Sequence, residues 1–190
     1  MKNRLALIIS RLAHPISLIL IFMAYTFFNL HEPWKATWTL TAIIVIGILP
    51  FVIWNQSRTK KGIYTNFDVS VRRDRYSMFA LILALTLLVI LFILFSNQPW
   101  PVLAGSLVLL LLVVVSFVLN FWLKVSLHMA VAGYVALGFW QIHYLPAILL
   151  FMAIPFIAWS RKQLGRHQND ELIVGGLIGL ASGILLLMIS

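Results

Sequence analysis

The stretch YSMFALILALTLLVILFILFSNQPWPVLAGSLVLLLLVVVSFVLNFWL, residues 76–123, contains no Lys, Arg, Asp or Glu. A helix needs roughly 20 residues to cross the hydrocarbon of a bilayer, so this uncharged run is long enough to cross twice. We expect the break between the two crossings at SNQPWP (96–101), because prolines and polar side chains favour a turn at the membrane interface. This stretch therefore predicts a membrane protein built of helices.

The composition of the whole chain agrees with this prediction. Of its 190 residues, 62% are hydrophobic and 10% are charged, whereas a soluble domain averages about 45–50% apolar and about 25% charged residues. Lipid offers no hydrogen-bond partner to an exposed backbone, so helices are the expected elements. We predict an all-α integral membrane protein, a single domain over 1–190, with helices at about 12–30, 37–54, 77–96, 101–121, 128–143, 145–160 and 172–189.

The fifth and sixth helices could also be one, because 125–160 is a single uncharged run. The stretch QIHYLP (141–146) carries polar groups and a proline, which favour a turn. The prediction is therefore a bundle of six or seven transmembrane helices, with seven preferred.

Seven crossings would place the N-terminus and the loops 55–76, 122–127 and 161–171 on one side of the membrane. Thirteen of the fourteen Lys and Arg residues fall on that side, and Lys35 falls on the other. The positive-inside rule then makes the first side cytoplasmic, in a plasma or inner membrane. The net charge of +9 lies in short loops between apolar spans. It therefore favours membrane lipids as partners, not nucleic acid, and no oligomeric state is predicted.

Three short segments on this side combine bases, acids and histidines: FDVSVRRDRY (67–76), KVSLH (124–128) and SRKQLGRHQNDE (160–171). Each directly precedes an apolar helix, and helix N-termini attract anions. Arginines and lysines gathered at a membrane edge are costly unless something negative binds them. We therefore expect the three segments to form one polar site for an anion at one membrane face.

The histidines in two of these segments indicate chemistry. His167 and Glu171 are spaced i, i+4, so that they can meet on a helix, and a carboxylate on one ring nitrogen makes the other more nucleophilic. Ser126 and His128 supply a hydroxyl and a second titratable group. Two histidines with opposite roles, surrounded by cations, are what phosphoryl transfer through a phosphohistidine requires.

Plainer interpretations exist for each of these residues. Ser126 can be a helix cap, His128 an interfacial histidine, and Arg72, Arg73 and Arg75 anchors for lipid headgroups. Asp68 and Asp74 are expected to pair with neighbouring arginines. The remaining histidines are expected at the interface or in packing, and we assign no chemistry to them: His14, His31 and His143.

The third segment resembles the third signature of the type 2 phosphatidic acid phosphatase family, which is Ser-Arg, five residues, His, three residues and Asp. KVSLH is similar to the second signature of that family, Pro-Ser-Gly-His. RRDRY resembles the end of the first signature, a Lys followed seven residues later by Arg-Pro. The signatures occur in the family's order and cover a small part of the chain.

The resemblance implies a metal-independent lipid phosphatase without a cofactor. His167 would attack phosphorus and Glu171 would orient it, while His128 would protonate the leaving alcohol and then activate water. The phosphoryl oxygens would be held by Arg161, Arg75, Ser126, and either Lys124 or Arg72. The implied substrate is a lipid phosphate or diphosphate, such as phosphatidic acid, phosphatidylglycerol phosphate or a polyprenyl phosphate.

The chain departs from the family pattern at several positions. Glu171 replaces Asp, Leu127 replaces Gly, Val125 and Tyr76 replace prolines, and Asp68 stands where the first signature has Lys. Two further functions therefore stay open. One is a lipid-phosphate binder or transporter without turnover, and the other is a phosphotransferase that passes the phosphoryl group to another alcohol.

Overall fold

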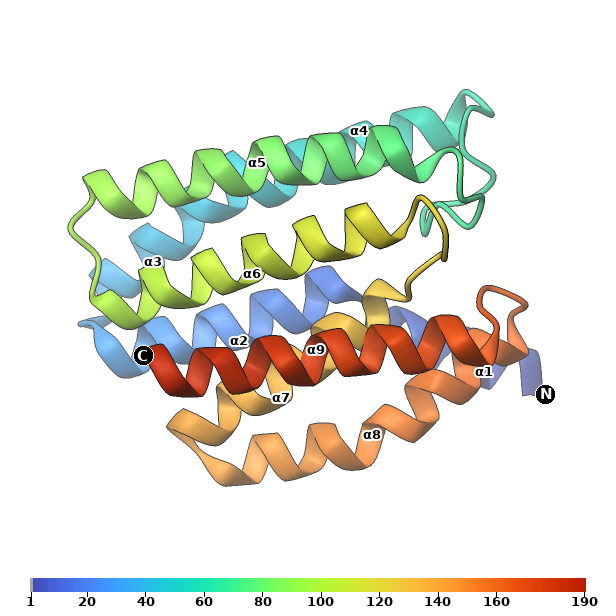
Figure 1. The fold of residues 1–190 in the computed structure, drawn as a ribbon. Helices are drawn as coiled ribbons and strands as arrows, with labels where there is room; N and C mark the ends of the chain where they lie inside the picture. The colour runs from blue at the N-terminus through green and yellow to red at the C-terminus, as the bar shows by residue number, and fades with distance from the viewer. Residues whose placement is uncertain (1) are drawn as a thin grey trace.

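The computed structural model describes residues 2–190, and within that range it contains helices and no strands (Figure 1). The predicted all-α fold is therefore confirmed. The elements are α1 (Lys2–Leu12), α2 (Pro15–Leu30), α3 (Pro33–Ile43), the π-helical η1 (Ile44–Ile48), α4 (Leu49–Lys60), α5 (Arg75–Phe95), α6 (Trp100–Leu119), α7 (Leu127–Ile142), α8 (Tyr144–Gln163) and α9 (Asn169–Ile189).

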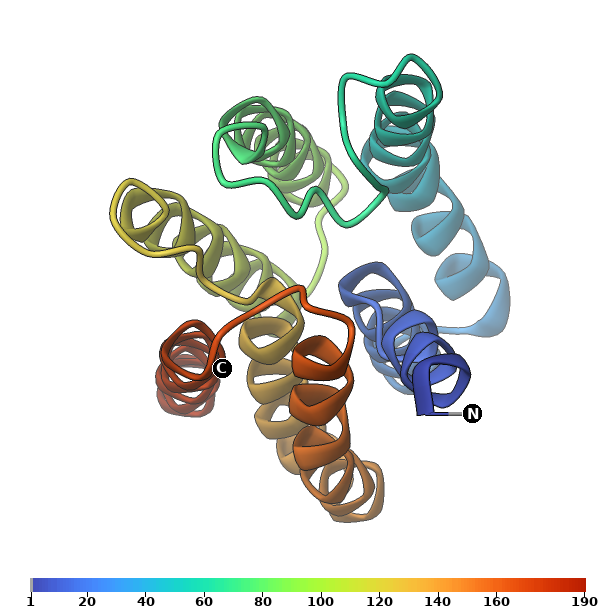
Figure 2. The ribbon, with the colours of Figure 1, turned by 90° about the vertical axis from the view of Figure 1, so that its right-hand side faces the viewer.

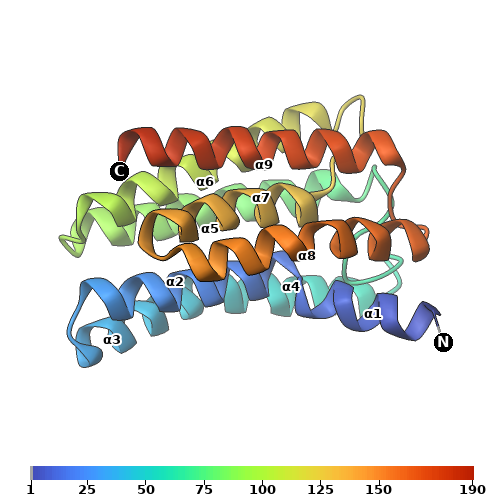
Figure 3. The same cartoon turned by 90° about the horizontal axis from the view of Figure 1, so that it is seen from below.

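Five helical segments are long and apolar enough to cross a membrane: Pro33–Lys60, which joins α3, η1 and α4, together with α5, α6, α8 and α9. The bent pair α1 and α2 would make a sixth, and α7 is a shorter apolar helix of 16 residues. The helices run roughly parallel to one long axis, and the two termini lie at opposite ends of it (Figure 3). These features identify a multi-pass membrane protein.

The first apolar region differs from the prediction of one helix over 12–30. Residues 2–12 form a helix of their own, α1, which meets α2 at an angle of 41°. His14 between them is extended, with φ −62° and ψ 139°. The cause is Pro15, because a proline disfavours helical backbone in the residue before it.

The helix predicted at 37–54 is longer and irregular in the structure. It extends from Pro33 to Lys60 and contains the π-helical turn η1 just before Pro50. Pro50 has no N–H to donate and its ring crowds the carbonyl of the residue four positions earlier. The wider turn accommodates this, and Leu49 N–H donates to the carbonyl of Ile44, five residues back.

The predicted turn near residue 143 is confirmed, because α7 and α8 are separate helices that meet at His143. The last helix begins at Asn169, three residues before the predicted start. Gln168 and Glu171 form a capping box there, in which each side chain accepts a hydrogen bond from the other residue's backbone N–H. Such a box satisfies two backbone donors and fixes where a helix begins.

Glycines hold α9 against α7. A Cβ atom on Gly175 would lie 2.5 Å from the carbonyl oxygen of Ser126, and a Cβ on Gly179 would collide with the carbonyl of Ala130. Small residues at such a spacing let two membrane helices approach backbone to backbone. The close approach places the start of α7, with Ser126 and His128, beside the start of α9.

We expect Gly175→Ala to destabilise the fold by about 1–3 kcal/mol, the usual cost of overpacking a tight interface. The added methyl would push the start of α7 away from α9, so the measurement is chemical unfolding in detergent micelles. Gly176→Ala is the matched control, because its Cβ would meet its nearest neighbour, Met129, at 3.9 Å. Equal stability of the two variants would contradict this account of the interface.

Candidate functional site

Three loops lie at the end of the bundle that also carries the N-terminus (Figure 2). They connect α4 to α5, α6 to α7 and α8 to α9, and each overlaps one of the three polar segments singled out in the sequence. Side chains link them: Arg161 Nη1 donates to Asp68 Oδ2 at 2.6 Å, and Arg166 Nη1 donates to Ser70 Oγ at 2.6 Å. The backbone N–H of Ser126 donates to the carbonyl of Glu171 at 3.2 Å and joins the second segment to the third. The three segments therefore meet in one place, although they are far apart in the chain.

His167 lies against Glu171 at the start of α9. The distance from His167 Nδ1 to Glu171 Oε2 is 2.8 Å, and the His167 side chain is 8% exposed. His167 precedes the helix, so the contact arises from the capping box that points Glu171 back toward the loop. A carboxylate that accepts from Nδ1–H leaves the lone pair of neutral His167 on Nε2.

Three cations surround this pair: Arg75, Lys124 and Arg161. Lys124 Nζ lies 3.6 Å from Glu171 Oε2. The two arginines are buried, and Arg75 Nη1 and Arg161 Nε have no hydrogen-bond partner among residues 2–190. Buried donors without partners cost free energy, so this arrangement favours an anion that would accept from them.

Ser126 and His128 lie on the other side of the same region, at the start of α7. Ser126 occupies the N-cap position, but its side chain makes no capping bond and its Oγ is buried without a partner in the described chain. His128 is 4% exposed and its Nε2 is equally unpartnered within residues 2–190. His128 lines the cavity described below and is therefore available to a ligand, whereas Ser126 does not line it.

The structure does not bring Arg72 into this region. Its side chain is exposed, and Nη1 donates to the carbonyl of Trp122 at 2.8 Å. Arg75, one helical turn later, has its guanidinium 5.1 Å from the ring centroid of Phe79 inside the bundle. Between Arg72 and Lys124, which the sequence left as alternatives, Lys124 is the one that lines the cavity.

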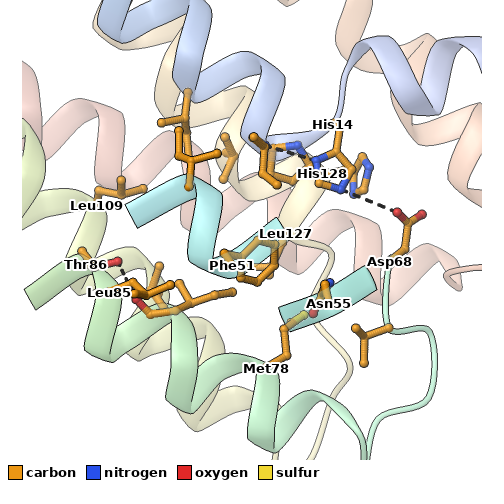
Figure 4. A pocket seen from close by; sticks show the side chains of 18 of the residues that line it. His14, Phe51, Asn55, Asp68, Met78, Leu85, Thr86, Leu109, Leu127 and His128 are labelled. Carbon is orange, nitrogen blue, oxygen red and sulfur yellow. Dashed lines mark hydrogen bonds and ion pairs between the residues drawn. The ribbon is translucent and has the colours of Figure 1, made fainter. Parts of the chain in front are cut away.

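A cavity of about 200 Å³ joins these polar groups to the interior of the bundle. Five of the eight predicted site residues line it: Arg75, Lys124, His128, Arg161 and His167. Its remaining wall is mostly apolar and comes from α2 to α7, with Ile19, Ile43, Phe51, Met78, Leu85 and Val113 among its residues. Figure 4 shows His14, His128 and Asp68 at one end and Leu85 and Leu109 further along.

The apolar part of the cavity is long. On α5 its lining residues extend from Arg75 to Val89, which corresponds to about 21 Å at 1.5 Å per residue. The cationic end of the cavity suits a negatively charged group, and its apolar extension suits a hydrocarbon chain. The cavity as a whole therefore suits an amphipathic anion.

The sequence did not identify two residues of the polar end, His14 and Asp68. His14 Nε2 lies 3.6 Å from Asp68 Oδ1, and the rings of His14 and His128 meet edge to face with centroids 5.2 Å apart. Asp68 pairs with Arg161, 93 residues away, not with its neighbouring arginines. The one local signal was the dipeptide His14-Pro15, because proline favours the first position of a helix and would make His14 the residue before it.

Burial, together with the charges of Arg161, Arg75 and Lys124, lowers the pKa of His167 from 6.5 to about 2. His167 therefore stays neutral in the folded protein across the physiological range, as a nucleophile requires. In the unfolded chain its pKa returns to about 6.5.

This pKa difference predicts a loss of stability in acid. Below about pH 6.5 the unfolded chain binds a proton at His167 that the folded protein does not, so stability falls as the pH falls. Between pH 7 and pH 5 the contribution is about 2 kcal/mol. Chemical unfolding in micelles should show that His167→Gln loses less stability over this interval than the unchanged chain. His143→Gln, at an exposed position, should keep the original pH dependence. Parallel pH profiles for all three proteins would contradict the shift.

No family model, no curated protein and no solved structure matches this chain.

Proposed function

We propose that the chain is a membrane-embedded phosphatase that hydrolyses a lipid phosphate or diphosphate through a phosphohistidine at His167. The observation that supports this most strongly is the amphipathic cavity, which has buried cations and the His167–Glu171 pair at its polar end. The phosphoryl group would lie among Arg75, Arg161 and Lys124, and the hydrocarbon chain would lie between the helices. Phosphatidic acid, phosphatidylglycerol phosphate and polyprenyl phosphates have this form.

The proposed mechanism has two steps. In the first, Nε2 of His167 attacks phosphorus, the bond to the leaving oxygen breaks, and His128 gives that oxygen a proton. In the second, water attacks the phosphohistidine while His128 takes a proton from it, which releases phosphate and regenerates His167. Glu171 keeps Nδ1–H of His167 in place throughout.

We also propose that the site faces the cytoplasm, because the end of the bundle that carries it holds thirteen of the fourteen Lys and Arg residues. The C-terminus lies at the opposite end (Figure 3). A reporter fused after Ser190 would then be found outside the cytoplasm, and a cytoplasmic reporter would contradict this orientation.

The experiment that tests the function is phosphate release by the purified protein from a panel of lipid phosphates in EDTA-containing buffer. Arg75→Gln should lower kcat/KM by about 100-fold, the usual effect of removing one donor that stabilises developing charge. Arg73→Gln is the matched control, because Arg73 is exposed two residues away. Equal rates for the two variants would contradict the placement of the phosphoryl group.

One observation favours the second candidate, a lipid-phosphate binder without turnover. Leu127, which stands where the resembled signature has glycine, has its side chain in the wall of the cavity. There it would narrow the space around a phosphoryl group. Tight binding of a lipid phosphate with no phosphate release by the unchanged protein would favour the binder, and transfer to an added alcohol without hydrolysis would favour a phosphotransferase.

A further inference from the structure

A cluster of three side chains lies at the polar end of the cavity: His14, Asp68 and His128. The proposed mechanism gives a role to His128 but none to His14 or Asp68. Each residue has a polar side-chain atom within 4.8 Å of those of the other two. They come from three distant parts of the chain: the bend between α1 and α2, the loop before α5 and the start of α7. Figure 4 shows the three side chains turned toward one another.

Hydrogen bonds to neighbouring groups determine which atoms of His14 and Asp68 can donate or accept within the cluster. Nδ1 of His14 accepts the backbone N–H of Ile16 at 3.2 Å and caps α2. The ring proton of neutral His14 is therefore on Nε2, which faces Asp68. Asp68 Oδ2 accepts from Arg161, so Oδ1 is the oxygen that faces His14.

The three residues face the cavity, where one small molecule can contact all of them. His14 Nε2 and Asp68 Oδ1 are 3.6 Å apart, which is longer than a direct hydrogen bond of about 2.9 Å. A water molecule at about 2.8 Å from both atoms would subtend an angle of about 80° and would lie beside the line that joins them. His14, Asp68 and His128 all line the cavity, and their polar atoms lie within 4.8 Å of one another, so a water on the cavity side can contact all three.

We propose that His14, Asp68 and His128 hold the water molecule that attacks the phosphohistidine. This inference rests on the proposed function. The water would accept from His14 Nε2–H and donate to Asp68 Oδ1 and to Nε2 of His128, which is buried and unpartnered within residues 2–190. One lone pair of the water oxygen stays free for attack. Asp68 also accepts a hydrogen bond from Arg161. The carboxylate of Asp68 would therefore contact both the water and the guanidinium that is proposed to hold the phosphoryl group.

The step is balanced in atoms and charge. The water oxygen forms a bond to phosphorus while the bond between phosphorus and Nε2 of His167 breaks, and His167 keeps the electron pair. His128 Nε2 takes the proton that the water loses. This proton is then available for the leaving oxygen of the next substrate. His14 and Asp68 exchange no proton, so they are positioning residues.

The same three residues resemble a set of metal ligands, so the cluster could hold either a water molecule or a metal ion. The hydrogen bond from Ile16 N–H to His14 Nδ1 favours the water. A metal on Nε2 would require that nitrogen to lose its proton while Nδ1 still accepts from Ile16. The ring would then be an imidazolate, which is costly beside Asp68. A water molecule uses the Nε2 proton as a donor and needs no such change.

The variant that tests the proposal is His14→Asn. Asparagine is a good helix cap, so it retains the bond to α2, but it is too short to reach toward Asp68. Substrate is mixed rapidly with the purified protein in detergent micelles, and alcohol release and phosphoenzyme decay are followed separately. We expect alcohol release with an unchanged burst, and decay of the phosphoenzyme about 100-fold slower, the effect of misplacing a reacting group. His143→Asn is the control and should match the unchanged chain in both steps.

The outcomes separate this inference from the function on which it rests. Accumulation of phosphoenzyme in His14→Asn, with normal alcohol release, supports the water site. Decay at the original rate, or equal slowing of both steps, overturns the water site and leaves the phosphatase intact. An unchanged protein that forms no phosphohistidine overturns both. Turnover that is lost in EDTA and restored by zinc would assign the cluster to a metal ion and overturn the proposal.

Discussion

His167→Ala is expected to lower the rate of phosphate release by about 1,000-fold or more, because removing a covalent nucleophile eliminates the main reaction path. In the proposed mechanism this imidazole attacks phosphorus; it is held by Glu171 at 2.8 Å and kept neutral by its burial among cations. Substrate binding should change much less, because Arg75, Arg161 and Lys124 remain in the cavity. The measurement is steady-state release of inorganic phosphate, with kcat and KM determined separately.

The control for this variant is His143→Ala, which removes an exposed imidazole at the opposite end of the bundle. It should leave kcat and KM unchanged. A His167→Ala protein that is folded, as judged by its elution as a single species in micelles, and that retains the original kcat would exclude the phosphohistidine mechanism.

Glu171→Gln is expected to lower kcat by about 100- to 10,000-fold while the fold stays intact. Glutamine serves in a capping box as well as glutamate does, so the start of α9 should be preserved. The neutral amide would no longer accept a charge-assisted bond from His167 Nδ1–H, and it can present N–H to the ring and favour the wrong tautomer. It would also remove the carboxylate that lies 3.6 Å from Lys124 Nζ.

Asp170→Asn removes a neighbouring carboxylate that is exposed at the same helix start. Both variants lose one negative charge near the N-terminus of α9, so they share any loss from the helix dipole. A difference in kcat between them therefore reports on the contact with His167. Equal kcat values would show that Glu171 acts only as a cap.

The helices could be predicted because each depends on a local property, a long run without charge. The runs 76–123 and 125–160 broke where polar groups and prolines indicated, at 96–101 and near His143. The predictions were wrong where a proline acted inside an apolar run. Pro15 separates α1 from α2, and Pro50 follows a π-helical turn. A hydropathy profile reveals neither the break at Pro15 nor the π-helical turn before Pro50, because both alter the backbone conformation and leave the polarity of the sequence unchanged.

The residues of the site could be predicted in part, for a similar reason. His167 and Glu171 are close in sequence, so their contact could be predicted, although it forms through the capping box and not on one helix as expected. The ion pair of Arg161 with Asp68 joins residues 93 positions apart, and only the packing of the helices brings them together. Gly175 and Gly179 set the approach of α7 to α9, but without the partner helix they are indistinguishable from other small residues.

The most direct test of the account is to locate the phosphate during turnover. The protein is mixed with a lipid phosphate, stopped within the first turnover by alkali, which preserves phosphohistidine, and mapped by mass spectrometry of its peptides. We predict phosphate on His167 and none on His14 or His128. Hydrolysis that proceeds with no phosphate on His167, or with phosphate on another residue, would contradict the account.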